Sequence, residues 1–192
     1  MISSGDSLMQ NDLFQQVDGG AIPTSPLQLR IREISAFSAS EFNKRWHSRL
    51  PIIRNYFCCS LCFGAFFGED CFATAMWGRP VARAFNGKPV LELRRMAIKD
   101  KAPKNTASRM IGIMISMIRK KYPHITQLIS YQDCDVHTGT IYKASGWTAG
   151  RRTKASEVRW GVLNKDGSGR KRSKIVAGGD KIRWEKTLKE PL

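Results

Sequence analysis

VLELRRMAIKDKAPKNTASRMIGIMISMIRKKY, residues 90–122, is the stretch that decides the fold. It predicts a strand, a basic loop and a long amphipathic helix in direct succession. The helix is indicated by apolar residues three and four positions apart, which form one stripe along its length. These residues are Met110, Ile113, Met114, Met117 and Ile118.

The strand at the start of this stretch has a break in its pattern. Leu91 and Leu93 share one parity, whereas Met96 and Ile98 share the other. Because side chains alternate between the faces of a strand, one regular register cannot place all four in the same core. An extra residue at Arg94-Arg95 restores the pattern and predicts a β-bulge, a feature common beside active sites. The alternative is an ordinary strand with imperfect alternation.

The loop before the helix is strongly basic. Lys101, Lys104 and Arg109 surround the helix start, where Thr106 or Ser108 can provide the cap. A helix N-terminus has free N–H groups and a partial positive charge, so it can hold an anion. We therefore expect either a phosphate site or a solvated basic turn.

Charge is the outstanding feature of the composition. The 192 residues include 32 Lys and Arg against 16 Asp and Glu, a net charge of +16. Such a balance favours a polyanionic partner, either nucleic acid or an anionic membrane. No apolar run reaches the ~20 residues of a membrane span, and the N-terminus lacks the pattern of a signal peptide. Nucleic acid is the favoured partner, with no membrane association.

The five cysteines lie mostly in the apolar run YFCCSLCFGAFFG. Cys59-x-x-Cys62 could be half of a zinc knuckle, but no second pair follows at zinc spacing. Buried cysteine acting as a small hydrophobe is the alternative that we favour, and we expect no disulfide bonds.

We expect an α/β fold with three parts. Residues 1–26 form a flexible arm, 27–163 a folded domain and 164–192 a mobile or partly ordered basic tail. In the domain, a capping box at Ser38–Glu41 opens a helix that Pro51 ends. The other predicted elements are strands at 27–34, 52–67, 71–77, 126–131, 147–153 and 157–163, and a short helix at 138–144.

This order, with its bulged fourth strand and central helix, resembles the GNAT superfamily of acyl-CoA N-acetyltransferases. The resemblance implies a mixed, mostly antiparallel sheet with flanking helices. The superfamily has an Arg/Gln-x-x-Gly-x-Gly/Ala signature at the start of the central helix. Here its two late glycines fall on Thr106 and Ser108, and its first position falls near Pro103. The missing glycines place ordinary CoA binding in doubt, because glycine lets the backbone approach pyrophosphate closely.

A closer resemblance is to the Mom family of phage DNA-modification proteins. It is carried by LELRRMAIKDKAPKNTASRMIGIM, by LISYQDCDVHTGTIYKASGWTAGRRTKASEVRWG and by the basic tail, and it covers nearly the whole chain. The resemblance implies a GNAT-like enzyme that adds a carbamoylmethyl (acetamido)-type group to adenine N6 in phage DNA. It also implies protection of that DNA from host restriction, and work in the host cytoplasm.

The end of the fifth predicted strand is the place where we expect the chemistry, by analogy with sheets that bind ligands at strand ends. Asp133 is the first choice for a general base, with Tyr131 beside it. The alternative for an Asp here, a helix N-cap, suits Asp135 better. The resemblance implies that Tyr142 protonates the leaving group, although a packing role is an equal alternative.

His47 is a further catalytic candidate, and a structural role is the alternative. The Mom family has a His, Asp and Tyr set of iron-ligand types, and His47, Asp133 and Tyr142 match this set here. The donor stays open: an acyl-CoA-type thioester, a glycyl donor such as an aminoacyl-tRNA, or a metal-assisted route. Candidate donor-binding residues are Arg94, Arg95, Met96, Ile98, Lys104, Asn105, Thr106, Ser108 and Arg109.

Double-stranded DNA is the expected partner, with the target adenine extruded from the helix. Phe85, Trp77 and Trp147 are candidates to stack on that base. The oligomeric state stays open, with a dimer one possibility. Two alternatives remain for the function: a non-catalytic DNA- or RNA-binding protein, and an acetyltransferase for protein or small-molecule amines. Expected DNA-binding residues are Arg79, Arg83, Arg151, Arg152, Lys154, Arg170, Lys171, Arg172 and Lys174.

Overall fold

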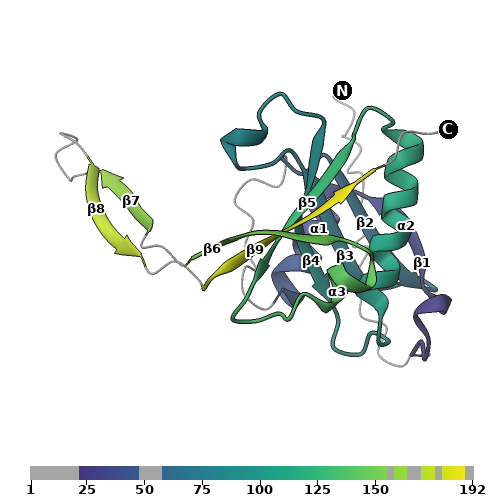
Figure 1. Ribbon diagram of the computed structural model, residues 1–192. Coiled ribbons are helices and arrows are strands. Elements are labelled where there is room, and N and C mark those ends of the chain that lie inside the picture. Colours follow the sequence, from purple (N-terminus) through teal and green to yellow (C-terminus); the bar gives the residue numbers. More distant parts are fainter. Residues whose placement is uncertain (1–21, 48–57, 155–157, 164–169, 176–178, 189–192) are drawn as a thin grey trace, which may run out of the picture.

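The computed structural model describes residues 22–47, 58–154, 158–163, 170–175 and 179–188 (Figure 1). The helices are α1 (Ala36–Trp46), α2 (Thr106–Lys121) and α3 (Thr140–Ala144), with 3-10 turns at Pro26–Gln28 and Arg83–Phe85. The strands are β1 (Arg30–Ile34), β2 (Leu61–Phe67), β3 (Asp70–Gly78), β4 (Val90–Ile98), β5 (Gln127–Asp133), β6 (Thr148–Thr153), β7 (Val158–Leu163), β8 (Arg170–Ile175) and β9 (Lys181–Thr187).

Seven strands form one sheet in the order β1-β2-β3-β4-β5-β9-β6. Every neighbouring pair is antiparallel except β4 and β5, which are parallel. The main core lies between one face of the sheet and α2, and it also includes Tyr142 from α3. Two smaller clusters pack α1 on the opposite face. The predicted mixed, mostly antiparallel sheet with flanking helices is therefore confirmed.

The β-bulge predicted in β4 is present at Arg94. Met76 pairs with Arg95 and Trp77 pairs with Leu93, so Arg94 is the extra residue opposite β3. Leu91 and Leu93 lie in the core on the α2 side, and Met96 and Ile98 pack against the same core. The bulge thus brings all four apolar residues to one face, as the sequence required.

The C-terminal part of the chain differs from the predicted tail. β9 pairs with β5 along its whole length and with β6 on its other side, so it lies inside the sheet. Trp184 at its centre is buried and donates from Nε1 to Gln132 Oε1 over 2.7 Å. The interpretation of 164–192 as a separate tail is therefore wrong for this strand. The folded domain continues to Leu188, which is also buried.

The front of the chain shows smaller differences. The first helix has Ser35 as its N-cap and ends at Trp46, so the capping box predicted at Ser38–Glu41 is wrong. The hairpin between β2 and β3 is as predicted, but β2 begins at Leu61, and predicted positions 52–57 and the predicted helix end at Pro51 lie outside the described residues. The cysteines Cys59, Cys62 and Cys71 are buried, as expected, whereas Cys58 is exposed.

Candidate functional site

The parallel pair β4 and β5 separates partway along its length. Pairing runs from Val90↔Gln127 to Leu93↔Ser130 and then stops. Beyond that point β4 continues along β3, and β5 continues along β9. The bulge at Arg94 comes directly after the last paired residue and turns β4 away from β5. The two strands therefore stop pairing beyond Leu93 and Ser130, and this break in strand pairing is called the opening below, with Leu93 and Ser130 at its closed end.

Tyr142 lies at this closed end on the α2 side. Ser130 Oγ donates to the Leu93 carbonyl oxygen over 3.0 Å and contacts the Tyr142 hydroxyl at 2.9 Å. Because a serine hydroxyl has one proton, that proton goes to Leu93 and the Tyr142 O–H donates to Ser130. The Tyr142 ring stacks on Trp184 with centroids 5.3 Å apart and meets the edge of Trp147 at 5.6 Å.

Burial keeps the Tyr142 hydroxyl protonated. Desolvation raises the pKa of Tyr142, and the hydrogen bond to Ser130 opposes this increase only in part. The phenol therefore keeps its proton across the neutral range and can supply it to a group in the opening. Its packing role and an acid role are compatible, because the ring packs while the hydroxyl lies at the opening.

Glu92 lies on the other face of β4, next to Leu93. Its side chain is buried, and its Oε2 accepts the Val81 N–H over 2.9 Å. Desolvation raises the pKa of Glu92, while the Val81 hydrogen bond and the charges of Arg94, Arg95 and Lys181 lower it. A buried carboxylate whose pKa is raised is a stronger base than an exposed one.

Sequence reasoning missed Glu92. The signal was present, because VLELRRMAI places one acid among the apolar residues of a strand expected to be central. A buried acid in a central strand indicates a special environment, since carboxylates are rarely buried without a partner.

His47 lies on the same face as Glu92, immediately after α1. Desolvation lowers the pKa of His47 to about 4, with further lowering by the positive charges of Arg95 and His137. The imidazole is therefore neutral at pH 7. Arg95 donates from Nη1 to the Arg94 carbonyl oxygen over 2.6 Å, and its buried Nε has no hydrogen-bond partner among the described residues. A polar surface made by Glu92, His47 and Arg95 thus borders the opening from the α1 side.

Asp133 and Tyr131 occupy the end of β5, where the sequence placed them. Asp133 Oδ1 accepts the Asp135 N–H over 3.1 Å and shapes the turn that follows. Neither Asp133 nor Asp135 caps α3, whose N-cap is Gly139 without a side-chain hydrogen bond, so the alternative of a helix cap at Asp135 is wrong. Burial raises the pKa of Tyr131, and so does the charge of Glu92.

The geometry does not support the predicted iron site. No group of three or more His, Cys, Asp or Glu in the described chain could hold a metal ion. Tyr142 belongs to the core on the α2 side and donates to Ser130, whereas His47 faces the charge of Arg95 from the α1 side. A cation beside His47 also disfavours a bound metal ion. His47, Asp133 and Tyr142 therefore do not form one ligand set.

The start of α2 differs in detail from the sequence prediction. Asn105 is the N-cap in a left-handed conformation, with φ of 65°, and makes no side-chain cap hydrogen bond. The hydroxyls of Thr106 and Ser108 donate to the carbonyls of Pro103 and Asn105, at 2.7 and 3.1 Å, so neither is the predicted cap. Arg109 Nη1 donates to the Leu29 carbonyl over 3.2 Å. The Thr106 N–H donates to the Pro103 carbonyl oxygen over 3.3 Å, and no side chain of the described residues caps this end of the helix.

Two of the aromatic side chains proposed for base stacking are part of the core. Trp77 and Trp147 are 0% and 5% exposed, and their rings lie 6.4 Å apart. The prediction that they stack on a base is therefore wrong. Phe85 is half-buried, and the Arg183 guanidinium lies 5.4 Å from its ring.

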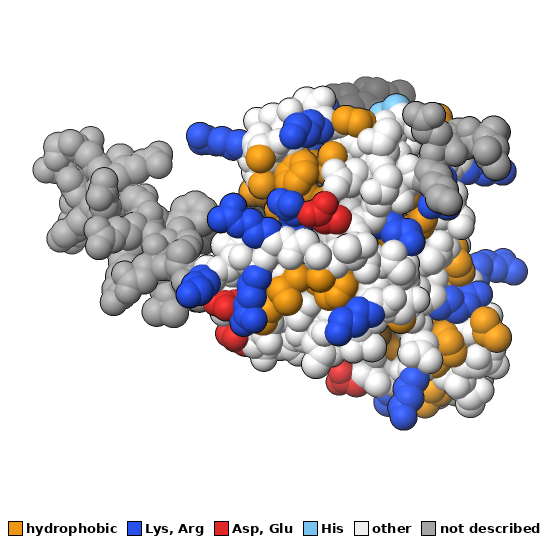
Figure 2. Space-filling view, in the orientation of Figure 1, with side chains coloured by type: hydrophobic (Ala, Val, Ile, Leu, Met, Phe, Trp, Pro, Cys, Tyr) orange, Lys and Arg blue, Asp and Glu red, His pale blue; other side chains and the backbone are white. Residues whose placement is uncertain are grey.

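Basic side chains extend well beyond the opening. Figure 2 shows Lys and Arg spread over the face in view, with few acidic side chains between them. Arg151, Arg152 and Lys154 are exposed on and after β6, and Arg152 Nε pairs with Asp180 Oδ2 at 2.9 Å. Arg79 and Arg83 are exposed in the loop after β3. Arg170, Lys171, Arg172 and Lys174 occupy β8.

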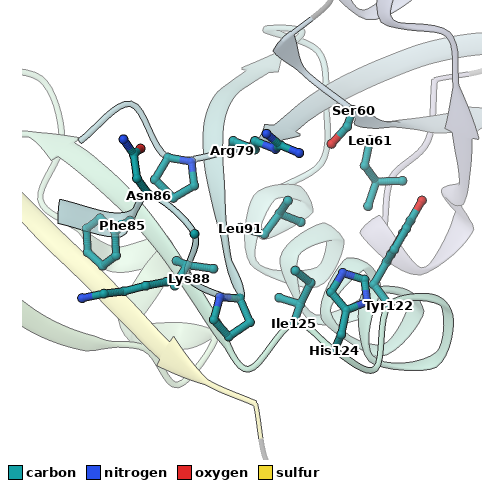
Figure 3. Close-up of a pocket in the computed structure, with 14 residues that line it drawn as sticks. Ser60, Leu61, Arg79, Phe85, Asn86, Lys88, Leu91, Tyr122, His124 and Ile125 are labelled. Carbon is teal, nitrogen blue, oxygen red and sulfur yellow. The ribbon is translucent and has the colours of Figure 1, made fainter. Parts of the chain in front are cut away.

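A hollow of about 800 Å³ lies at the start of β4, at the end opposite Ile98. Tyr122 and His124 form one side and Phe85 the other, with Arg79 between them (Figure 3). None of the described residues that line it is acidic. The Val81–Glu92 hydrogen bond ties the loop that lines this hollow to β4.

Comparison with known sequences gives one family. The model of the Mom protein family matches residues 28–187. A relative, "Methylcarbamoylase mom" from Escherichia phage Mu, is 27% identical over 142 residues, which are 69% of this chain and 57% of the relative. The chain thus spans a little over half the length of the curated relative that it matches.

Solved structures show the same fold at low sequence identity. A Bacillus subtilis acetyltransferase in complex with CoA gives a TM-score of 0.58 at 12% identity, covering 83% of this chain and 99% of that one. The ribosomal-protein-S18-alanine N-acetyltransferase of Escherichia coli gives 0.57 at 12% identity, covering 82% and 92%. A GNAT family acetyltransferase from Elizabethkingia anophelis with acetyl-CoA bound gives 0.56 at 13%, covering 84% and 99%. The fold is that of the GNAT acetyltransferases.

Proposed function

Because the chain belongs to the Mom protein family, we propose that it is a transferase that modifies adenine in phage DNA. The group added at N6 is of the carbamoylmethyl type, and its role is to shield the DNA from host restriction. The observation that carries the proposal is the opening between β4 and β5, with a protonated phenol on one side and a buried carboxylate on the other.

The chemistry requires two proton movements. The exocyclic amine of adenine forms a bond to the transferred carbon and gives up one proton, while the leaving group takes its electron pair and gains a proton. The amine is a poor nucleophile, because its lone pair is delocalised into the ring. Catalysis therefore depends on positioning the amine and on moving both protons at the same place.

Glu92 is the proposed proton acceptor for the amine. Its pKa is raised by burial, so the carboxylate is a stronger base than an exposed one. Val81 holds one oxygen by a backbone hydrogen bond, which fixes the side chain. Asp133, the first choice from sequence, uses Oδ1 in its own turn and is the second candidate.

Tyr142 is the proposed proton donor to the leaving group. Its phenol keeps a proton at neutral pH because burial raises its pKa. Tyr142 and Glu92 belong to opposite faces of the sheet at nearly the same height, beside Leu93. This separation suits a reaction in which the donor enters from the α2 side and adenine from the α1 side.

An acyl-CoA-type donor fits the residues on the α2 side. The first-turn amides of α2 can hold a pyrophosphate, with Lys101 and Lys104 exposed beside them. When bound, such a donor would supply an acyl carbon; a glycyl group attached in this way, N6–C(=O)–CH2–NH2, is an isomer of the carbamoylmethyl group, N6–CH2–C(=O)–NH2, and a later rearrangement would have to convert the one into the other. Thr106 and Ser108 take the place of the usual glycines, so the backbone approach is less close than glycine allows. A glycyl donor such as an aminoacyl-tRNA is the alternative.

Duplex DNA is the proposed acceptor, with the adenine extruded toward the α1 face. The net charge of +16 and the basic side chains around the opening support this partner. The hollow at Arg79 has no acidic side chain among its described lining residues and lies about 10 Å along β4 from Leu93, at ~3.3 Å per residue. It therefore offers the DNA backbone a basic surface beside the target.

Mass spectrometry of nucleosides from plasmid DNA tests the proposal. Cells that make the protein are compared with cells that carry an empty vector. We expect a new deoxyadenosine species heavier by one carbamoylmethyl group. If the DNA is unmodified while the protein is folded and binds duplex DNA, the transferase proposal is rejected in favour of a non-catalytic DNA-binding protein. Acetylated protein amines without modified DNA would favour the third alternative.

A further inference from the structure

The hollow at the start of β4 has two walls that backbone hydrogen bonds join. One wall is the loop after β3, which includes Arg79 and the 3-10 turn Arg83–Phe85, and the other is the turn between α2 and β5. The Pro89 carbonyl oxygen accepts the Thr126 and Gln127 N–H groups over 2.9 and 3.4 Å, which ties the two walls together. The volume of about 800 Å³ lies in the usual range of ligand pockets, roughly 300–1,000 Å³. The hollow is therefore a preformed site that is large enough for a small ligand.

Aromatic rings stand on both sides of the hollow (Figure 3). Phe85 lies on one side, and Tyr122 and His124 lie on the other with their rings edge to face, 6.2 Å apart. The space between them is lined by Leu91 and Ile125, which are apolar. Such a lining suits a flat aromatic group, because any base can stack on an aromatic side chain. It favours a nucleobase over a flexible or fully polar ligand.

The charged side chains of the hollow are positive. Arg79 and Lys88 are exposed at its edge, and none of the described residues that line it is acidic. Arg79 makes no ion pair with another residue of the described chain, and Lys88 Nζ lies 5.9 Å from the centre of the Phe85 ring. A base that enters the hollow carries its phosphate with it, and these two cations can neutralise that phosphate. The hollow thus fits a nucleotide, with the base inside and the phosphate at the edge.

The position of the hollow favours DNA over the donor as the source of this nucleotide. Tyr122, the C-cap of α2, lines the hollow, whereas the donor is proposed to bind at the first turn of the same helix. The 16 residues of α2 span about 24 Å at ~1.5 Å per residue. Val90, which lines the hollow, is only two residues from Glu92 along β4, or about 7 Å at ~3.3 Å per residue. Successive nucleotides of one duplex strand rise about 3.4 Å each, so this distance corresponds to about two nucleotides.

We propose that the hollow binds a nucleotide that flanks the target adenine, with its base unstacked between Phe85 and Tyr122 and its phosphate at Arg79. This inference rests on the proposed function and deepens it, because contacts to flanking nucleotides set the sequence context in which an extruded base is accepted. It also retains Phe85 as a base-stacking residue, a role that the buried Trp77 and Trp147 cannot have.

A DNA duplex with one bulged nucleotide tests the proposal, because its extra base is already unpaired. Fluorescence anisotropy compares a labelled duplex of this kind with a fully paired duplex of the same length. We expect the wild type to prefer the bulged duplex, and Phe85→Ala to bind it about 5- to 150-fold more weakly, the range for one lost base–aromatic stack. Phe85→Tyr keeps a ring in the same place and should retain the wild-type affinity. Arg79→Gln should lower the slope of log K against log salt by about 0.9, the contribution of one phosphate contact.

Two matched controls make the test specific. Trp46 is half-buried and has a lysine Nζ 5.9 Å from its ring, as Phe85 has, but that lysine is Lys99, at the other end of β4. Lys44 is an exposed cation of α1 and is the control for Arg79. We expect Trp46→Ala to keep the preference for the bulged duplex and Lys44→Gln to keep the wild-type salt slope. Circular dichroism verifies that each variant is folded.

Equal affinity of the wild type and Phe85→Ala for the bulged duplex would overturn the proposal, and so would an equal loss in Phe85→Ala and Trp46→Ala. Coenzyme A that displaces the bulged duplex from the wild type but not from Phe85→Ala would make the hollow a donor site and would also overturn it. The proposed transferase is judged separately, by modified deoxyadenosine in plasmid DNA. A protein that prefers the bulged duplex but never modifies DNA would retain the nucleotide site and reject the enzyme, whereas modified DNA without that preference would do the reverse.

Discussion

Tyr142→Phe separates packing from chemistry at the closed end of the opening. The substitution keeps the ring that stacks on Trp184 at 5.3 Å and meets Trp147 at 5.6 Å. It removes one hydrogen bond to Ser130, worth about 1 kcal/mol. Ser130 still donates to Leu93, so no donor is left unpaired there. For a chain of this size we expect the melting temperature to fall by about 2–4 °C.

The effect on activity should be much larger. If the phenol supplies the proton to the leaving group, its removal lowers the modification rate by about 10²- to 10⁴-fold. The rate is measured as modified deoxyadenosine formed over time, by mass spectrometry of digested DNA. Urea unfolding of the same preparation gives the change in stability.

Ser130→Ala is the matched control. It removes the same hydrogen bond and also leaves the Leu93 carbonyl and the Tyr142 hydroxyl without a partner, at a cost of about 1–3 kcal/mol for each buried group. We therefore expect Ser130→Ala to be the less stable variant and yet the more active one. A Tyr142→Phe protein that modifies DNA within a few-fold of the wild-type rate would refute the acid role and leave the ring as packing.

Three further predictions concern stability. Glu92→Gln should stabilise the fold at neutral pH. The folded-state pKa of Glu92 is raised, so the wild type loses stability as the pH rises from about 4.5 through that pKa, whereas the Gln variant does not. A difference between the urea midpoints of the two proteins that stays the same at every pH would contradict this. Gly139→Ala places a Cβ 2.5 Å from Trp184 and should therefore destabilise the fold. Gly87→Ala is the control, because Gly87 has a similar positive φ but no atom within 4 Å of the added Cβ, and it should cost clearly less stability. Equal melting temperatures of the two variants would disprove the clash. A chain that ends at Asp180 lacks β9 and should fail to fold, because β9 pairs with both β5 and β6. A cooperative melting transition of this truncated chain would contradict the prediction and show that the segment is dispensable for folding.

The central part of the fold could be predicted because local patterns decide it. The parity break between Leu93 and Met96 requires an extra residue, and the structure has it at Arg94. The apolar stripe from Met110 to Ile118 predicts α2 equally directly, because apolar residues three and four positions apart share a face of a helix and not of a strand.

The last strand was missed although its pattern is visible. Ile182, Trp184 and Leu188 fall on one parity, but the surrounding Lys and Arg suggested a solvated tail. Its place between β5 and β6 depends on pairing with strands far away in the chain, which composition does not reveal.

The candidate site shows the same limit. Sequence placed Tyr142 near the chemistry through family resemblance, and the structure locates it at the closed end of the opening. Glu92 could not be ranked from sequence, because its importance comes from burial and from the Val81 hydrogen bond. His47 and Tyr142 are residue types that bind metal ions, but they lie on opposite faces of the sheet.

The central claim is that Glu92, at the opening between β4 and β5, accepts the proton of the target amine. The most direct measurement compares modified deoxyadenosine in DNA from cells that make the wild type or Glu92→Gln, with protein levels and duplex binding matched. The account predicts modification by the wild type and a loss of at least a hundred-fold in Glu92→Gln, with DNA binding retained. Equal modification by the two proteins would contradict it and return the role to Asp133.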